Sequence, residues 1–388
     1  MNDFSIFEKC FREKKNITFI MINDNYQSFD IYSSCHTKSQ QITINFNRVN
    51  KMQIDDILIE ITNLLSKDSF SKGINIILFY EYFFSRKPIL YKAKETLISK
   101  IKNVSKNFNN TLFFVPIFYQ LENEPDEEYI ENIINYNNCI ITEDHPFANW
   151  DVNYFFIQIT KNKKNWIANE VLVIFEEEVI LSHKKAVFFY EIVSKELLET
   201  FNYDFGFGLN NIITNNNNVI ELAKIVDKYV SIQICKECQN ELLFLRKYFM
   251  KFDEEKLYGD NKKYFIEKKK LFQKLEMPKD MEKNIYLIFS NSTTIENILH
   301  TFKENSIIAQ IDPFSNGLFT IKYNEVVKAK IKELIININD LTETEYTYLS
   351  NIIKRNFYNV VSEIKYDYDR KEIKKNNYRF SVEYFKIS

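Results

Sequence analysis

Glycine and cysteine are both scarce in this chain of 388 residues, which contains five of each. Five cysteines at irregular spacing do not indicate a disulfide framework, so we expect reduced thiols. No apolar run approaches the roughly 18 residues that a membrane-spanning helix needs, and residues 1–15 lack the apolar core of a secretory signal. Net charge is also small, because 51 Lys and Arg face 53 Asp and Glu. The sequence therefore predicts a cytoplasmic protein without general attraction to nucleic acid or anionic membranes.

Material for a hydrophobic core is abundant, since 45% of the residues are hydrophobic and 16% are aromatic, which excludes a disordered chain. Short β-branched and aromatic runs alternate with amphipathic stretches, and this pattern predicts an α/β fold. The expected strands are 16–22, 41–45, 74–79, 111–116, 170–175, 179–183, 229–234, 285–289, 306–310 and 318–323. The expected helices are 52–65, 92–104 and 240–250, with a lysine-rich helical segment over 252–276 and a last core element over 329–335.

The composition changes near Asp340, where the chain becomes charged and rich in tyrosine. We therefore predict one domain over residues 1–340 and a C-terminal helix with a charged, Tyr-rich tail over 341–388. Basic residues gather between Arg370 and Arg379, but acidic residues interrupt them. This mixture favours a solvated interaction tail over a nucleic-acid site.

Three polar residues each follow an apolar strand, in the order carboxylate, lysine, cysteine. They are Glu81, Lys184 and Cys235. Strand ends on one edge of a sheet converge, and a thiol becomes a nucleophile when a base takes its proton and a cation or helix N-terminus stabilises the thiolate. The pattern indicates acyl transfer through a cysteine.

The motifs around these residues resemble those of the nitrilase superfamily, the carbon–nitrogen hydrolases. Residues 76–85 (IILFYEYFFS) are similar to that family's apolar strand and catalytic Glu with a following aromatic. Residues 169–175 and 179–185 are similar to its Asn, its hairpin and its catalytic Lys, and residues 231–237 to its strand and nucleophilic Cys. Three motifs in the family's order are more specific than any one alone. The resemblance spans residues 17–323.

The resemblance implies a four-layer αββα sandwich with a C-terminal extension. It implies Glu81 as general base, Cys235 as nucleophile, and Lys184 with the backbone N–H of Lys236 as stabilisers of the oxyanion. Glu191 is the expected second active-site Glu. Alternatives remain at two positions: Glu196 or Glu199 for Glu191, and Lys185 for Lys184. His183 is more typical of a hydrogen-bonded structural residue than of a base.

The implied activity is cleavage of a non-peptide C–N bond of a small-molecule amide, or of a nitrile, through a Cys235 thioester. The resemblance also implies no metal, no organic cofactor and a homodimer. Two flanks depart from the family pattern, because Tyr80 replaces a Pro and Ile117 replaces a Gly. These departures motivate one alternative, a nitrilase-like binding protein without catalysis. An acyltransferase using the same thioester is another.

Cys235 and Cys238 also form a C-x-x-C, which is typical of redox pairs and of zinc sites. The pair comes late in the chain and lacks an aromatic-Cys-Gly-Pro context, which disfavours the redox interpretation. A zinc site needs two further ligands at suitable spacing, and neither Cys139 nor His183 belongs to such a pair. The carbon–nitrogen hydrolase is therefore the favoured hypothesis.

Overall fold

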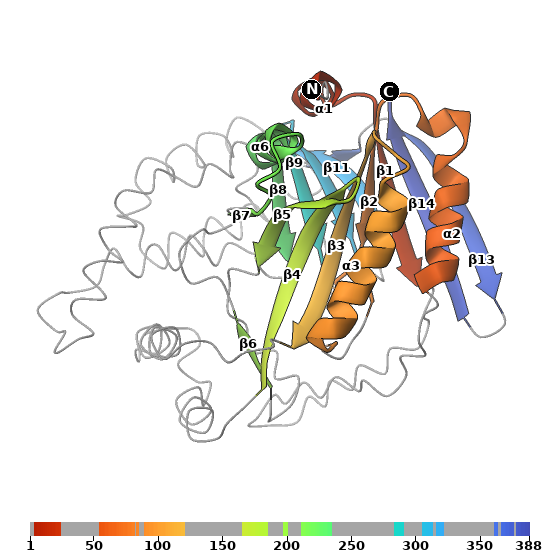
Figure 1. Cartoon of the computed structure of the whole chain (residues 1–388). Coiled ribbons are helices and arrows are strands. Elements are labelled where there is room, and N and C mark those ends of the chain that lie inside the picture. Colours follow the sequence, from red (N-terminus) through yellow and green to blue (C-terminus); the bar gives the residue numbers. More distant parts are fainter. Residues whose placement is uncertain are drawn as a thin grey trace, which may run out of the picture.

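The structure is a computed structural model that describes residues 4–24, 54–81, 83–84, 89–120, 165–184, 197–200, 211–234, 283–290, 305–312, 316–321, 361–363, 366–375 and 378–388. These residues form a mixed α/β protein with two β-sheets (Figure 1). The large sheet contains β1 (Ile17–Asp24), β2 (Ile74–Phe79), β3 (Thr111–Gln120), β4 (Asn165–Phe175), β5 (Glu178–Lys184), β6 (Leu197–Thr200), β7 (Asn211–Ile212), β13 (Asp367–Lys375) and β14 (Tyr378–Ile387). The small sheet contains β8 (Val230–Ile234), β9 (Ile285–Phe289), β10 (Ile307–Ile311), β11 (Gly317–Ile321) and β12 (Val361–Glu363).

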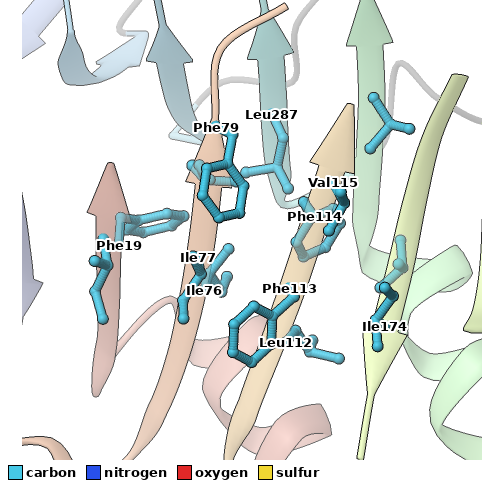
Figure 2. Close-up of a cluster of buried hydrophobic side chains, with 14 of the residues drawn as sticks. Phe19, Ile76, Ile77, Phe79, Leu112, Phe113, Phe114, Val115, Ile174 and Leu287 are labelled. Carbon is cyan, nitrogen blue, oxygen red and sulfur yellow. The ribbon is translucent and has the colours of Figure 1, made fainter. Parts of the chain in front are cut away.

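The large sheet has the spatial order β13-β14-β1-β2-β3-β4-β5-β7, with β6 paired to β4, and the small sheet has the order β12-β11-β10-β9-β8. The two sheets pack face to face. Phe114 of β3 stacks on Phe289 of β9, with ring centroids 6.5 Å apart. Figure 2 shows Leu287 of the small sheet among side chains of the large sheet such as Phe79. The core is therefore an aromatic and aliphatic layer between two sheets.

Two helices cover the other face of the large sheet (Figure 1). They are α2 (Ile54–Leu65) and α3 (Tyr91–Ser105). In α2 the buried side chains include Ile57, Ile61 and Leu64, whose spacing places them on one helical face. The described residues thus give three layers: helices, large sheet and small sheet. A helical layer beyond the small sheet, which a four-layer sandwich requires, stays a prediction. No helix among the described residues is long and apolar enough to cross a membrane.

The parallel strands of both sheets run in the same direction. Within the large sheet β1, β2 and β3 are parallel, and within the small sheet β8, β9 and β10 are parallel. Near the strand starts, Asn284 Nδ2 donates to the carbonyl oxygen of Phe11 at 3.0 Å. Near the strand ends, Asn23 Nδ2 donates to the carbonyl oxygen of Asp312 at 3.2 Å. The C-terminal ends of β1, β2, β8, β9 and β10 therefore lie at one edge, which we call the C-terminal edge.

Helix α1 (Ser5–Glu13) lies at the opposite edge, where the parallel strands begin (Figure 1). Phe4 and Phe7 make edge-to-face contacts with Phe175 at the tip of β4, at 5.8 and 5.7 Å between centroids. Glu8 accepts hydrogen bonds from Lys228 and from the hydroxyl of Tyr229, at the end of α6 (Ile220–Tyr229). The hydrogen bond from Lys228 is the largest cause that lowers the pKa of Glu8. Sequence reasoning predicted neither helix.

Gly73 shows where one of the few glycines is required. It precedes β2 with a φ of +88°, and a Cβ there would lie 2.2 Å from the carbonyl oxygen of Asn16. Left-handed backbone also occurs at Asn16 and Asn305, whose side chains tolerate it. Asparagine thus serves at turns where a chain richer in glycine would use glycine.

Most strands predicted from the sequence are confirmed, and residues 74–79 and 285–289 match β2 and β9 at both ends. Strand β3 is longer than expected, because it continues past Pro116 to Gln120. Pro116 lies beyond the positions at which β3 pairs with β2, so its missing N–H interrupts no ladder there. The elements predicted over residues 41–45, 240–250, 252–276 and 329–335 lie outside the described residues.

The prediction of a solvated tail is wrong for the residues of β13 and β14. Residues 341–360, where the predicted C-terminal helix and tail begin, lie outside the described residues. Strand β14 pairs with β1 along its length, and β13 pairs with β14. Phe380 is fully buried and Val382 is 3% exposed. Most of the charges that suggested a tail lie on β13, the outermost described strand of the large sheet, where charged side chains discourage further strand pairing. The end of the chain is therefore part of the large sheet.

Replacing Phe380 by Ala should lower the free energy of unfolding by about 3 to 5 kcal/mol, because the change leaves a cavity between packed side chains. Asp367→Ala, at an exposed position of β13, is the control and should cost less than about 0.5 kcal/mol. Urea unfolding followed by circular dichroism measures both. Equal, negligible effects would mean that this segment is a tail after all.

Candidate functional site at the C-terminal edge

Glu81 lies two residues after β2, at the C-terminal edge, and its side chain is completely buried. Asn169 of β4 donates from Nδ2 to Glu81 Oε1 at 2.7 Å. Asn169 is itself 1% exposed. Both residues belong to motifs that carry the family resemblance, although they are 88 positions apart. The structure therefore brings together two site residues that the sequence placed in different motifs.

The hydrogen-bonded pair lies between the two sheets. Asn169 is directly opposite Phe118 in the β3–β4 register, and opposite residues of an antiparallel pair share a face. Phe118 and Phe114 are four positions apart on β3, so they also share a face, and Phe114 stacks on Phe289 of the small sheet. Asn169, and with it the Glu81 carboxyl group, thus faces the small sheet.

Aromatic side chains surround the turn that carries Glu81. Tyr80 packs edge to face on Phe83 with centroids 5.3 Å apart, and Phe79 lies 5.1 Å from Phe83 and 4.7 Å from Phe84. Tyr80 is 1% exposed. The Tyr that replaces the family's Pro is therefore accommodated in the core, and the turn is shielded from water on this side. Ile117 is likewise a buried residue inside β3.

The structure describes only some of the other predicted site residues. The Cα of Lys184, the last residue of β5, is paired with that of Glu170, and His183 is paired with Val171. His183 is completely buried and shares the face of Val171, and hence of Asn169. Glu191, Cys235 and Lys236 lie outside the described residues. Ile234, immediately before Cys235, is opposite Phe289 at the end of β8, so β8 leads to the same edge as Glu81.

A second buried polar group at this edge was missed by the sequence analysis. Ser290 directly follows β9 and donates to Asp312 Oδ2 at 2.8 Å, and Asp312 directly follows β10. Gln310 donates to the Ser290 hydroxyl at 3.4 Å. The signal that singled out Glu81, a polar residue just after an apolar strand, also applies to Ser290 and Asp312. Ser290 directly follows Phe289, which is opposite Ile234 at the end of β8, so this polar group lies at the edge to which β8 leads.

Cys10 differs from the cysteine proposed for chemistry. It lies in α1, at the edge away from Glu81, and is 4% exposed. Burial raises the pKa of its thiol, with a further contribution from Glu13. Cys10 is therefore a packing residue with little thiolate. Within the described part of the chain, no three His, Cys, Asp or Glu side chains are grouped so that they could hold a metal ion.

No protein-family model matches the chain, and no curated protein matches it. Among solved structures, the chain is similar to a glutamine-dependent NAD+ synthetase from Acinetobacter baumannii, in complex with adenosine diphosphate, at 8% identity and a TM-score of 0.28. The match covers 71% of this chain and 33% of that one, so the chain spans about a third of the length of its structural neighbour. A likeness of this size assigns neither a family nor an activity.

The hydrogen bond between Asn169 and Glu81 should be measurable as a coupling. Asn169→Leu removes the donor from a buried carboxyl group and should lower the free energy of unfolding by about 1 to 3 kcal/mol. In a Glu81→Leu background the same change should cost less than half as much, because the group that loses its donor is gone. Urea unfolding of the four proteins gives the cycle, and costs that add within about 0.5 kcal/mol would contradict the contact.

Proposed function

We propose that the chain is a thiol amidohydrolase that cleaves the C–N bond of a small-molecule amide through a Cys235 thioester. The observation that carries the proposal is the buried hydrogen bond between Asn169 and Glu81, at the edge to which β8 leads one residue before Cys235. A thiol nucleophile requires a general base, and a buried, hydrogen-bonded carboxyl group at the edge to which β8 leads can supply one. The family resemblance of the sequence motifs supports the same reaction.

In the proposed reaction Glu81 takes the proton of the Cys235 thiol, and the thiolate attacks the amide carbon. The carbonyl oxygen becomes an oxyanion, which a lysine ammonium and the backbone N–H of Lys236 stabilise. The intermediate collapses, Glu81 returns the proton to the leaving amine or ammonia, and a thioester remains. Water, deprotonated by Glu81, then attacks the thioester, the acid leaves, and the thiol is restored.

Asn169 has a positioning role in this scheme. Its hydrogen bond to Oε1 fixes the plane of the Glu81 carboxyl group, and proton transfer is assigned to the other oxygen. General-base catalysis needs the base within hydrogen-bond reach of the proton. A carboxyl group that is held in one orientation therefore gives a higher rate than one that rotates freely. Glu191 keeps the role of second active-site Glu that the resemblance implies.

The oxyanion cation is proposed to be Lys184, the assignment that the resemblance implies, with Lys185 as the alternative. The Cα of Lys184, at the end of β5, is opposite that of Glu170, whose carboxylate contacts α3 on the outer face of the large sheet. Comparison of Lys184→Met with Lys185→Met decides between the two lysines.

A nitrile substrate, or transfer of the acyl group to an acceptor other than water, uses the same thioester and is the alternative within this proposal. No cofactor enters the scheme, and the proposed assembly is a homodimer. Near-zero net charge, 51 basic against 53 acidic residues, suits a small neutral substrate rather than a polyanion.

Brief treatment with iodoacetamide should alkylate Cys235 at least about tenfold faster than the other four cysteines, because an adjacent base raises the thiolate fraction. Intact-mass spectrometry should show a single rapid adduct in wild type and in the control variant Cys10→Ala, and none in Cys235→Ala. Slow, uniform labelling would favour a binding protein without catalysis. Two rapid adducts that map to Cys235 and Cys238 would favour the redox or zinc interpretation.

Ammonia release from a panel of primary amides tests the hydrolase itself. Glu81→Gln should lower kcat by about 10²- to 10⁴-fold, because the general base is lost. Lys184→Met should lower it by about 10²- to 10³-fold, because the oxyanion loses its cation, and more than Lys185→Met does. A larger loss in Lys185→Met would assign the cation to Lys185 instead. Turnover that persists in Cys235→Ala would contradict the thioester mechanism.

A further inference from the structure

A buried ion pair lies on the outer face of the large sheet, directly behind the candidate site. Lys94 of α3 donates to Glu170 Oε2 at 3.3 Å, and the Tyr119 hydroxyl of β3 donates to the same oxygen at 3.0 Å. The Lys94 ammonium also lies 3.7 Å from the centroid of the Tyr119 ring. We call these three residues the Glu170 cluster. Their exposed fractions are 8%, 5% and 4% for Lys94, Glu170 and Tyr119.

The Glu170 cluster joins three elements at one point of β4. Lys94 belongs to α3, Tyr119 to the end of β3 and Glu170 to β4. Ile89, just before α3, bridges to Tyr119 through the backbone. The neighbour of Glu170 on β4 is Asn169, which points to the opposite face and donates to Glu81. The cluster thus anchors β4 to a helix one residue away from the donor that holds Glu81.

Stability alone does not account for this arrangement. Removing two charges from water is costly, and an apolar replacement of a buried ion pair is often neutral or stabilising. What such a pair supplies is geometry, because a carboxylate with a cation and a hydroxyl on one oxygen has few alternative positions. Burial is the largest cause that raises the pKa of Tyr119, followed by the nearby Glu170 charge, so the hydroxyl remains a neutral donor.

We propose that the Glu170 cluster is a positioning device that fixes β4 so that Asn169 holds the Glu81 carboxyl group in its catalytic orientation. Glu170, Lys94 and Tyr119 act through Asn169 and do not touch substrate. This inference rests on the proposed hydrolase, since it assigns a role for that same site. It predicts that the cluster matters more for kcat than for folding or for substrate binding.

Four proteins separate positioning from stability: Glu170→Gln, Lys94→Met, the double variant Lys94→Met with Glu170→Leu, and Lys100→Met. Lys100 is the matched control, because it lies on the same helix and pairs with Asp55 of α2 at 2.7 Å, but at the surface and away from β4. Melting temperature, kcat and KM for amide hydrolysis are measured for each. The three changes in the cluster should lower kcat by about 10- to 100-fold with little change in KM, and Lys100→Met should change neither.

The double variant gives the decisive result. Because no unpaired buried charge remains, its melting temperature should return toward that of wild type, above those of both single variants. Its kcat should stay low, because the polar contacts that orient β4 are missing. A kcat that recovers together with the melting temperature would overturn the proposal, as would a loss no larger than that of Lys100→Met.

A separate readout does not depend on turnover. Glu170→Gln and Asn169→Leu are combined, and the shifts in melting temperature of the single and double variants are compared. Coupling through β4 should make the combined shift smaller than the sum, because a loosened β4 already weakens the hydrogen bond to Glu81. Additive shifts would overturn the positioning role. Absence of turnover in wild type, with this coupling present, would instead count against the hydrolase while leaving the positioning of Glu81 in place.

Discussion

The common direction of the parallel strands in two facing sheets is the constraint on which this structure depends. Because β1 to β3 and β8 to β10 run the same way, the C-terminal ends of these strands lie at one edge. The hydrophobic effect requires the strands themselves to be apolar, so polar groups collect where the strands end. The other edge is closed by α1, whose Phe4 and Phe7 pack on Phe175.

Strand β4 carries adjacent buried polar residues on the two opposite faces of the large sheet. Its successive residues Asn169 and Glu170 point in opposite directions, one to the hydrogen bond with Glu81 between the sheets and the other to the ion pair with Lys94 under α3. Buried polar groups on consecutive positions of one strand are expensive unless both are satisfied. Here each has a partner from a different element, so the register of β4 is set from both sides at once.

The C-terminal edge also contains buried polar groups that have no role in the proposed reaction. Ser290 and Asp312 hydrogen-bond at the ends of β9 and β10, and the backbone of Asp312 accepts from Asn23 at the end of β1. The hydrogen bond from Asn23 joins the two sheets at this edge, whereas the bond between Ser290 and Asp312 lies within the small sheet. Ile234, the last residue of β8, is opposite Phe289, so these polar contacts lie at the edge to which β8 leads.

The sequence by itself determined most strands, helices α2 and α3, and the placement of Glu81 at a strand end, because these depend on local periodicity. It did not determine that β13 and β14 extend the large sheet beyond β1, since the charged edge strand β13 and a solvated tail have similar compositions. Nor did it show that Asn169 meets Glu81, or that Glu170 meets Lys94 and position 184, which are decided by register between distant strands. Local pattern fixes what each segment can become, whereas contacts between segments far apart in the chain depend on how the sheets are assembled.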